Sequence, residues 1–213
     1  MKNDSKTFKH LHMEIRRVSL MDLDLVVRIH ENAFNHSFLT SLGSRFLRHY
    51  YHILLKDKGS TFLGSYNGNE LVGFCSIANH SKGYNKRLIK SNLLGFLCLG
   101  WNIVKSNPLY IIRLLMNLDK KSSQKDNGEY SEVLSIAVSK PYQGKGIGGK
   151  LLKFAEEDLK NQNYTKLSLT TDYYDNDSAI HFYRKNGYEI ISDFIAFPKR
   201  RMFRLIKTLN LFS

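Results

Sequence analysis

Cysteine is scarce in this sequence: only two occur among 213 residues, Cys75 and Cys98. Both lie among apolar residues, and no Cys-x-x-Cys spacing is present. Disulfide frameworks and structural zinc sites need more cysteine or histidine at set spacings. We therefore expect buried structural thiols and no bound metal.

Long apolar runs are missing as well. The longest, Leu93 to Val104, spans about twelve residues, whereas a membrane-spanning helix needs roughly twenty. Residues Met1 to Leu11 lack the apolar run of a secretory signal. The sequence therefore predicts a cytoplasmic protein without membrane contact. An interfacial helix within Leu88–Leu118 is the alternative. Core packing or dimerisation explains the apolar residues of this stretch more simply.

Acidic residues are outnumbered, because 32 lysines and arginines face 19 aspartates and glutamates, for a net charge of +13. Such a charge favours anionic partners: nucleic acid, a membrane surface, or small molecules that carry phosphate. The basic residues are spread along the chain, and no zinc finger or ribonucleoprotein-type aromatic motif is present. Nucleic acid is therefore not an expected partner.

The first half of the chain predicts a short strand, two amphipathic helices and a β-hairpin. In order, these are Met13–Ser19, Met21–Phe34, Leu42–Leu55, and the strands Thr61–Tyr66 and Glu70–Ala78. The turn Asn67-Gly68-Asn69 predicts the hairpin because Asn and Gly tolerate positive φ.

Residues 80–128 separate this half from the next strand. A loop of that length without structure would be unusual in a compact domain. Apolar spacing predicts a helical insertion with helices at about Lys86–Val104 and Leu109–Leu118, separated by Asn107-Pro108. Residues 120–128 read as an exposed turn.

The second half alternates strands and helices. Its elements are a strand at Glu132–Val138, glycines at 144–149, a helix at Lys150–Gln162, a strand at Lys166–Thr171, a helix at Ser178–Asn186, and strands at Tyr188–Ile195 and Met202–Leu209. Asp177 is the expected N-cap of the second helix and Gly187 its C-terminal stop. This order predicts an α/β fold with helices on the sheet faces, in one domain over residues 1–213.

The glycine loop after the strand Glu132–Val138 is the most informative segment. A helix that begins after such a loop leaves its first amide N–H groups free, and glycine lets a bulky anion approach the backbone. Together with the positive end of the helix dipole, this predicts a cradle for pyrophosphate. A P-loop is excluded because Leu151 follows Lys150 where Ser or Thr is required, and a dinucleotide fingerprint is disfavoured because the strand ends too early.

The same loop resembles the signature of the GNAT superfamily of N-acetyltransferases, Gln/Arg-x-x-Gly-x-Gly/Ala, through Gln143, Gly146 and Gly148. Downstream, Asn176–Tyr188 resembles the family pattern Asn-x-x-Ala-x-x-Phe-Tyr-x-x-x-Gly-Phe/Tyr. The likeness is close over Glu132–Tyr188 and loose in the first half. It implies the GNAT fold, a mixed sheet of about seven strands splayed between 132–138 and 166–171, with helices on both faces.

The resemblance also implies an acyl-CoA cosubstrate, either acetyl-CoA or a short-chain relative. Pantetheine would lie in the splay along the edge of strand 132–138, with strand amides holding the thioester and its oxyanion. The residues that the resemblance assigns to the cofactor are Ile136, Ala137, Val138, Gln143, Gly144, Lys145, Gly146, Ile147, Gly148, Asn176 and Tyr183. A simple turn remains the alternative for the loop, and a helix-capping turn for Asn176.

For catalysis, the resemblance assigns Tyr183 as the donor of a proton to the departing thiolate; a buried core tyrosine is the alternative. Glu132, His36 and His30 are the candidate general bases. Alternation puts Glu132 on one strand face with Leu134 and Ile136, and a solvated strand-end carboxylate is its alternative. Because no cysteine is placed to form an acyl-enzyme, we expect direct attack in a ternary complex.

The acceptor is the least constrained feature. The pattern His30-Glu-Asn-Ala-Phe34 with Phe38, Gly43 and Phe46 is similar to that of family members from surface-polysaccharide synthesis. This similarity implies a primary amine on an amino sugar, which can be nucleotide-linked. Protein, peptide or other small-molecule amines remain alternatives, as does a non-catalytic acyl-CoA sensor.

Overall fold

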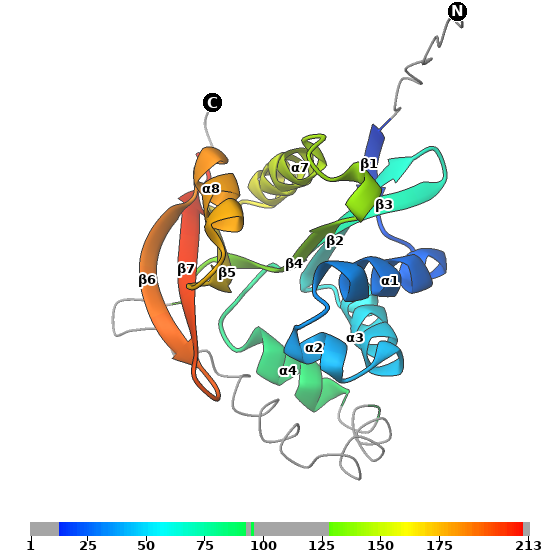
Figure 1. Ribbon diagram of the computed structural model, residues 1–213, viewed down its shortest axis with the longest axis horizontal. Coiled ribbons are helices and arrows are strands. Elements are labelled where there is room, and N and C mark those ends of the chain that lie inside the picture. Colours follow the sequence, from blue (N-terminus) through cyan, green and yellow to red (C-terminus); the bar gives the residue numbers. More distant parts are fainter. Residues whose placement is uncertain (1–12, 93–94, 96–127, 211–213) are drawn as a thin grey trace, which may run out of the picture.

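A seven-stranded mixed sheet forms the centre of the protein (Figure 1). The computed structural model describes residues 13–92, 95 and 128–210. The strand order is β1-β2-β3-β4-β5-β7-β6, and only the β4–β5 pair is parallel. The strands are β1 (Met13–Arg17), β2 (Ser60–Asn67), β3 (Glu70–Ala78), β4 (Ser131–Val138), β5 (Lys166–Asp172), β6 (Glu189–Ala196) and β7 (Arg200–Thr208).

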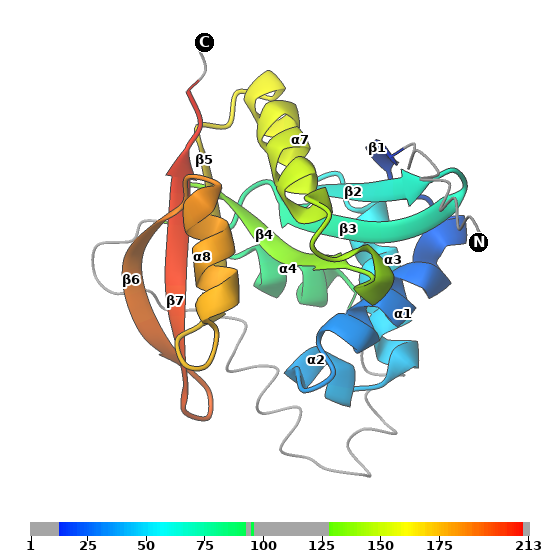
Figure 2. The same cartoon turned by 45° about the horizontal axis from the view of Figure 1, so that its top comes forward.

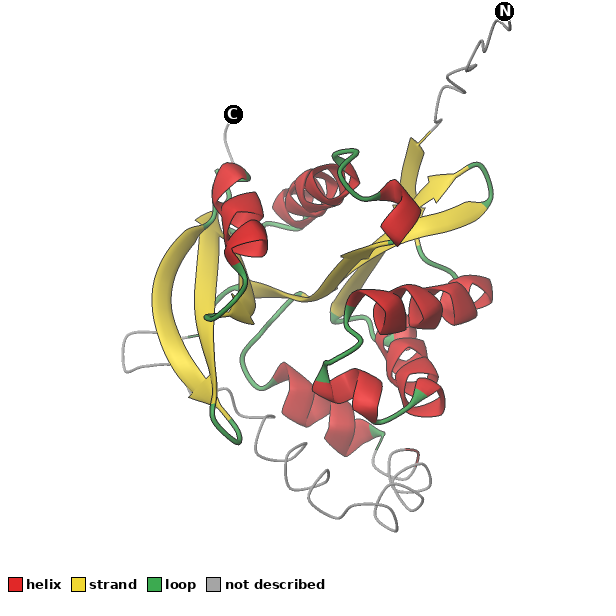
Figure 3. Cartoon of the chain, viewed as in Figure 1, coloured by secondary structure: helices red, strands yellow, loops and turns green. Residues whose placement is uncertain are grey.

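Helices cover both faces of this sheet, as the sequence predicted (Figure 3). Along the chain, they are the 3-10 turn η1 (Leu20–Asp22), α1 (Leu23–Ala33), α2 (Phe38–Ser41), α3 (Ser44–Lys56), α4 (Tyr84–Ser91), the 3-10 turn η2 (Lys140–Tyr142), α7 (Ile147–Asn161) and α8 (Asp177–Lys185). One apolar cluster packs α1 and α3 against β2 and β3, and the other packs α7 against the opposite face. The mixed α/β architecture is therefore confirmed.

The sheet opens between β4 and β5, which is the splay that the family resemblance implied (Figure 2). These two strands pair only where Ser131–Val133 meets Leu167–Leu169. Beyond Val133, β4 stays paired with β3 on one side, while β5 pairs with β7. The rest of β4 therefore presents an edge toward the gap.

A β-bulge in β4 breaks the predicted alternation. Ser135 lies opposite Ser76 and Val133 lies opposite Ile77, so Leu134 is an extra residue in the ladder. Leu134 packs against the α1–α3 cluster, whereas Ile136 packs against the α7 cluster. The prediction that Glu132, Leu134 and Ile136 share one face is therefore wrong, because period-two alternation does not survive a bulge.

Two helix starts differ from the predictions. Helix α7 begins at Ile147 rather than Lys150, so Gly148 and Gly149 belong to its first turn. The N-cap of α8 is Asn176 rather than Asp177. Gly187, with φ +86°, follows the C-cap of α8 and ends that helix as predicted.

The predicted insertion is described only in part. Helix α4 covers the start of the expected helix Lys86–Val104, and most of the remainder, with the expected helix Leu109–Leu118, lies outside the described residues. Among the residues that are described, no helix is long and apolar enough to cross a bilayer.

Candidate active site

Two adjoining clefts open where β4 and β5 diverge. The smaller cleft has a volume of about 410 Å³ and lies between the end of β4, the glycine loop, the start of α7 and α8. It is lined by Ile136, Ala137, Val138, Tyr142, Gln143, Gly144, Gly146, Ile147, Gly148, Gly149, Phe182 and Tyr183. Most of the residues predicted to bind the cofactor are therefore gathered around one hollow.

Glycine is required in the loop for two different reasons. Gly144 and Gly146 have φ values of +73° and +76°, in the left-handed region that side chains disfavour. Gly148 and Gly149 lie in helical backbone, where an added Cβ would approach α8: 3.2 Å from Phe182 Cζ for the first and 3.2 Å from Asn186 Oδ1 for the second. The first pair shapes the loop, and the second lets α7 pack closely against α8.

The start of α7 is suited to bind an anion. The first N–H groups of a helix have no partner within it, and the helix dipole adds positive potential there. Gln143 holds the loop in place, because its Nε2 donates a 2.9 Å hydrogen bond to the carbonyl oxygen of Val138. Lys145 is exposed, with its Nζ 5.1 Å from the ring centroid of Tyr142, and it is not among the lining residues.

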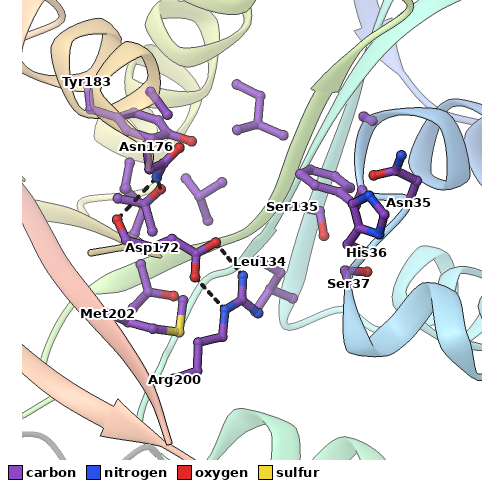
Figure 4. A pocket seen from close by; sticks show the side chains of 18 residues that line it. Asn35, His36, Ser37, Leu134, Ser135, Asp172, Asn176, Tyr183, Arg200 and Met202 are labelled. Carbon is purple, nitrogen blue, oxygen red and sulfur yellow. Dashed lines mark hydrogen bonds and ion pairs between the residues drawn. The ribbon is translucent and has the colours of Figure 1, made fainter. Parts of the chain in front are cut away.

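The larger cleft, of about 610 Å³, lies on the other side of the same opening (Figure 4). Its walls are the bulged part of β4, the end of β5, the start of β7, α8 and the turn between α1 and α2. The lining comprises Ala33, Phe34, Asn35, His36, Ser37, Val133, Leu134, Ser135, Ile136, Leu169, Thr170, Thr171, Asp172, Asn176, Ala179, Tyr183, Arg200 and Met202. Ile136 and Tyr183 line both clefts, so a molecule in one can meet a molecule in the other at these residues.

Tyr183 comes from the middle of α8 and is half-buried. Its hydroxyl forms no hydrogen bond with another described residue. Burial, with a smaller contribution from Cys75, raises the pKa of Tyr183 well above its ordinary value. The phenol therefore stays protonated at neutral pH and is able to donate its proton at the junction of the clefts.

Asn176 lines the larger cleft, but its amide group is engaged with β5. Its Nδ2 donates to Thr171 Oγ1 at 2.5 Å and to the carbonyl oxygen of Asp172 at 3.2 Å. It occupies the N-cap position of α8 without a side-chain cap bond. Asn176 thus joins the start of α8 to the end of β5, and it does not line the smaller cleft.

Glu132 is buried rather than solvated, since only 4% of the residue is exposed. Its Oε1 lies 3.6 Å from Nη1 of Arg204, and its Oε2 accepts a 2.8 Å hydrogen bond from Ser81. The alternative of a solvated carboxylate is therefore wrong. Glu132 is not among the residues that line either cleft, and it ties β4 to β7 beneath the splay.

The two candidate histidines have different surroundings. His30 is 2% exposed, its Nδ1 is 2.6 Å from the Tyr51 hydroxyl, and burial lowers its pKa to about 4. It shares the buried face of α1 with Val26 and Val27 and lines neither cleft, which corrects the expectation that it reaches the acceptor. His36 is exposed and lies across the larger cleft from Tyr183 (Figure 4).

Asp172 and Arg200 line the larger cleft, although the sequence patterns pointed to neither as a site residue. Arg200 binds both carboxylate oxygens of Asp172, through Nε and Nη2. The neighbouring Tyr173 does not line this cleft, and its ring stacks on the guanidinium of Arg201, whose Cζ is 3.9 Å from the ring centroid. The available signal was the position of Asp172 at the end of a strand that borders the splay.

Comparisons with known proteins agree with this geometry. The family model described as the acetyltransferase (GNAT) family matches residues 24–188. A comparison with curated proteins found no match.

Many solved structures have a similar fold, at sequence identities that establish the fold alone. The Escherichia coli ribosomal-protein-S18-alanine N-acetyltransferase is 12% identical with a TM-score of 0.59, covering 94% of this chain and 96% of its own. The PaiA N-acetyltransferase of Thermoplasma acidophilum, in complex with coenzyme A, is 16% identical with a TM-score of 0.57, covering 92% and 98%. The spermidine/spermine N-acetyltransferase SpeG of Vibrio cholerae is 14% identical with a TM-score of 0.57, covering 92% and 94%.

Proposed function

The chain belongs to the GNAT family of acetyltransferases and is an acyl-CoA-dependent N-acyltransferase; from that premise, we propose that it acylates the amine of an amino sugar, in a nucleotide-linked form. The observation that carries this proposal is the lining of the larger cleft. Alongside apolar residues, its lining includes the hydroxyl and amide side chains of Asn35, Ser37, Ser135 and Thr171. Such groups both donate and accept hydrogen bonds, which is what the hydroxyls of a sugar require.

The smaller cleft would hold the cofactor. In this proposal, the amides of Gly144 to Gly148 bind the pyrophosphate at the start of α7. Pantetheine follows the open edge of β4, and the backbone near Ile136 to Val138 holds the thioester carbonyl and stabilises its oxyanion. Acetyl or a short acyl group then lies at the junction beside Tyr183.

The reaction follows as direct transfer. The amine nitrogen attacks the thioester carbon and forms a tetrahedral intermediate whose negative oxygen faces the β4 amides. The nitrogen loses a proton to His36, either directly or through a water molecule. The C–S bond then breaks, and the coenzyme A thiolate takes the phenolic proton of Tyr183, which is regained from solvent.

A panel of acceptors tests the proposal. Purified enzyme with acetyl-CoA should release free thiol with nucleotide-linked amino sugars at a kcat/KM at least about tenfold above that with spermidine or an alanine-terminated peptide, because a matched set of hydrogen-bonding groups is worth more than about 1.4 kcal/mol. Turnover of the peptide or spermidine without turnover of any sugar would reject it. Binding of acetyl-CoA with no thiol release for any amine would instead indicate an acyl-CoA sensor.

The base assignment has its own test. His36→Asn should lower kcat/KM by about tenfold or more at neutral pH, since positioned general bases contribute at least that much. His52→Asn is the matched control, because His52 lies on α3 and does not line the cleft. Equal activity of the two variants would remove His36 from the mechanism.

A further inference from the structure

Arg200 is the one lysine or arginine among the described residues that line the larger cleft. It is the first residue of β7, and its guanidinium extends toward the middle of the cleft, beside Asp172 and Leu134 (Figure 4). The side chains of Arg200 and Asp172 are 41% and 40% exposed. An ion pair this exposed contributes little to folding stability, so stability alone does not explain its place in the cleft.

The hydrogen bonds of this pair leave one edge of the guanidinium open. Nε and Nη2 donate to the carboxylate, and Nη1 has no polar partner among the described residues. The bidentate contact fixes the plane of the guanidinium, because two parallel hydrogen bonds remove its rotation. Two N–H groups of Nη1 are therefore held ready for a ligand in the cleft.

The charges around this edge favour a negative ligand. Asp172 is the one acidic residue among the described residues that line the cleft, and Arg200 occupies both of its oxygens. The other titratable lining residues are His36 and Tyr183, and the raised pKa of Tyr183 keeps that phenol neutral. The cleft thus offers an open cationic edge, and its one carboxylate among the described lining residues is already paired with Arg200.

We propose that the Nη1 edge of Arg200 binds an oxyanion, either a phosphate or a carboxylate, that belongs to the same molecule as the acceptor amine. Asp172 holds the guanidinium of Arg200 in the orientation that this binding requires. This inference rests on the proposed function and narrows it: the enzyme selects amines that also carry a negative group. In a nucleotide-linked amino sugar, that group is the diphosphate. The planar fork of arginine suits such oxygens better than the point charge of lysine.

Arg201 supplies a matched control. It is the next residue of β7, it donates to Asp193 through Nε at 2.8 Å, and it stacks on Tyr173. Because successive residues of a strand face opposite sides, it points away from the cleft. The side chains of Arg201 and Asp193 are 39% and 42% exposed, so Arg201→Gln removes the same charge and an ion pair of similar exposure.

The test compares KM for an amino sugar and its phosphorylated form. Arg200→Gln should raise KM for the phosphorylated acceptor by about tenfold or more, because it removes a charge-assisted hydrogen bond to the phosphate. The neutral acceptor makes no such bond, so its KM should change by less than about twofold. The Kd of acetyl-CoA should stay unchanged. Arg200→Lys should lie between wild type and Arg200→Gln, and Arg201→Gln should match wild type. Equal changes in KM for both acceptors, or none, would overturn the inference.

A binding measurement separates this inference from the proposed function. With coenzyme A saturating the smaller cleft, inorganic pyrophosphate should raise the melting temperature of wild type and of Arg201→Gln but not of Arg200→Gln. If no sugar reacts while carboxylate-bearing amines do, with the same dependence on Arg200, the sugar assignment fails and the anion site stands. If pyrophosphate acts equally on all three proteins, the anion site fails whichever acceptor is used.

Discussion

Replacing Tyr183 with Phe should lower kcat by about 10- to 100-fold while the Kd of acetyl-CoA stays within about twofold, in keeping with the usual contribution of a general acid. The hydroxyl is at the junction of the two clefts and has no hydrogen-bond partner among the described residues. Its loss therefore removes a proton donor without disturbing a described contact. Steady-state kinetics and calorimetry measure the two quantities.

The control is Tyr164→Phe, which removes a hydroxyl 3.2 Å from His80 Nε2; Tyr164 lies in the loop between α7 and β5 and lines neither cleft. That variant should retain wild-type kcat. The raised pKa of Tyr183 adds a prediction about pH. Because the phenol stays protonated in mildly alkaline solution, ionisation of Tyr183 should not lower kcat at any pH up to about 10. Full activity of Tyr183→Phe would return Tyr183 to its alternative role as a core residue.

Replacing Gly146 with Asp should raise the Kd of coenzyme A by about 100-fold or more, an effect of about 2.7 kcal/mol. Gly146 has φ +76°, and a side chain in that region costs roughly 1–2 kcal/mol. A carboxylate at the start of α7 also repels the diphosphate that the free amides would bind. Calorimetry with coenzyme A measures the change.

Gly68→Asp is the control, because Gly68 has φ +60° in the β2–β3 turn and an added Cβ there meets nothing within 4 Å, as at Gly146. Both variants carry the same kind of backbone strain and the same added charge. Only Gly146→Asp should lose affinity, and both should remain folded. Unchanged coenzyme A binding by Gly146→Asp would remove the loop as the pyrophosphate site.

The sequence was most informative where structure is local. The loop from Gln143 to Gly148 and the helix that carries Tyr183 were both identified, since the signals lie within a few consecutive residues. A left-handed glycine, a helix start and a C-terminal stop depend on backbone preferences of the residues themselves. Even here, α7 starts three residues before the predicted start. The prediction missed this first turn because Gly148 and Gly149 have no side chain that marks helical spacing.

Helix phase could have separated the two histidines in advance. His30 follows Val26 and Val27 by four and three residues, which puts it on the apolar face of α1. His36 follows the end of that helix and is exposed. The sequence therefore contained the reason why, of these two histidines, His36 lines the larger cleft and His30 does not.

By itself, the sequence determined the fold class, the glycine loop before α7 and the helix that presents Tyr183, because each is set by residues close together in the chain. Only the tertiary structure decided that Glu132 is buried against Arg204, that Leu134 is a bulge, and that Arg200 and Asp172 line the larger cleft. These features depend on pairing between strands far apart in sequence, where a register shift of one residue exchanges the faces. The sequence therefore indicated the glycine loop and Tyr183, whereas the side chains that line the larger cleft opposite them came only from the tertiary structure.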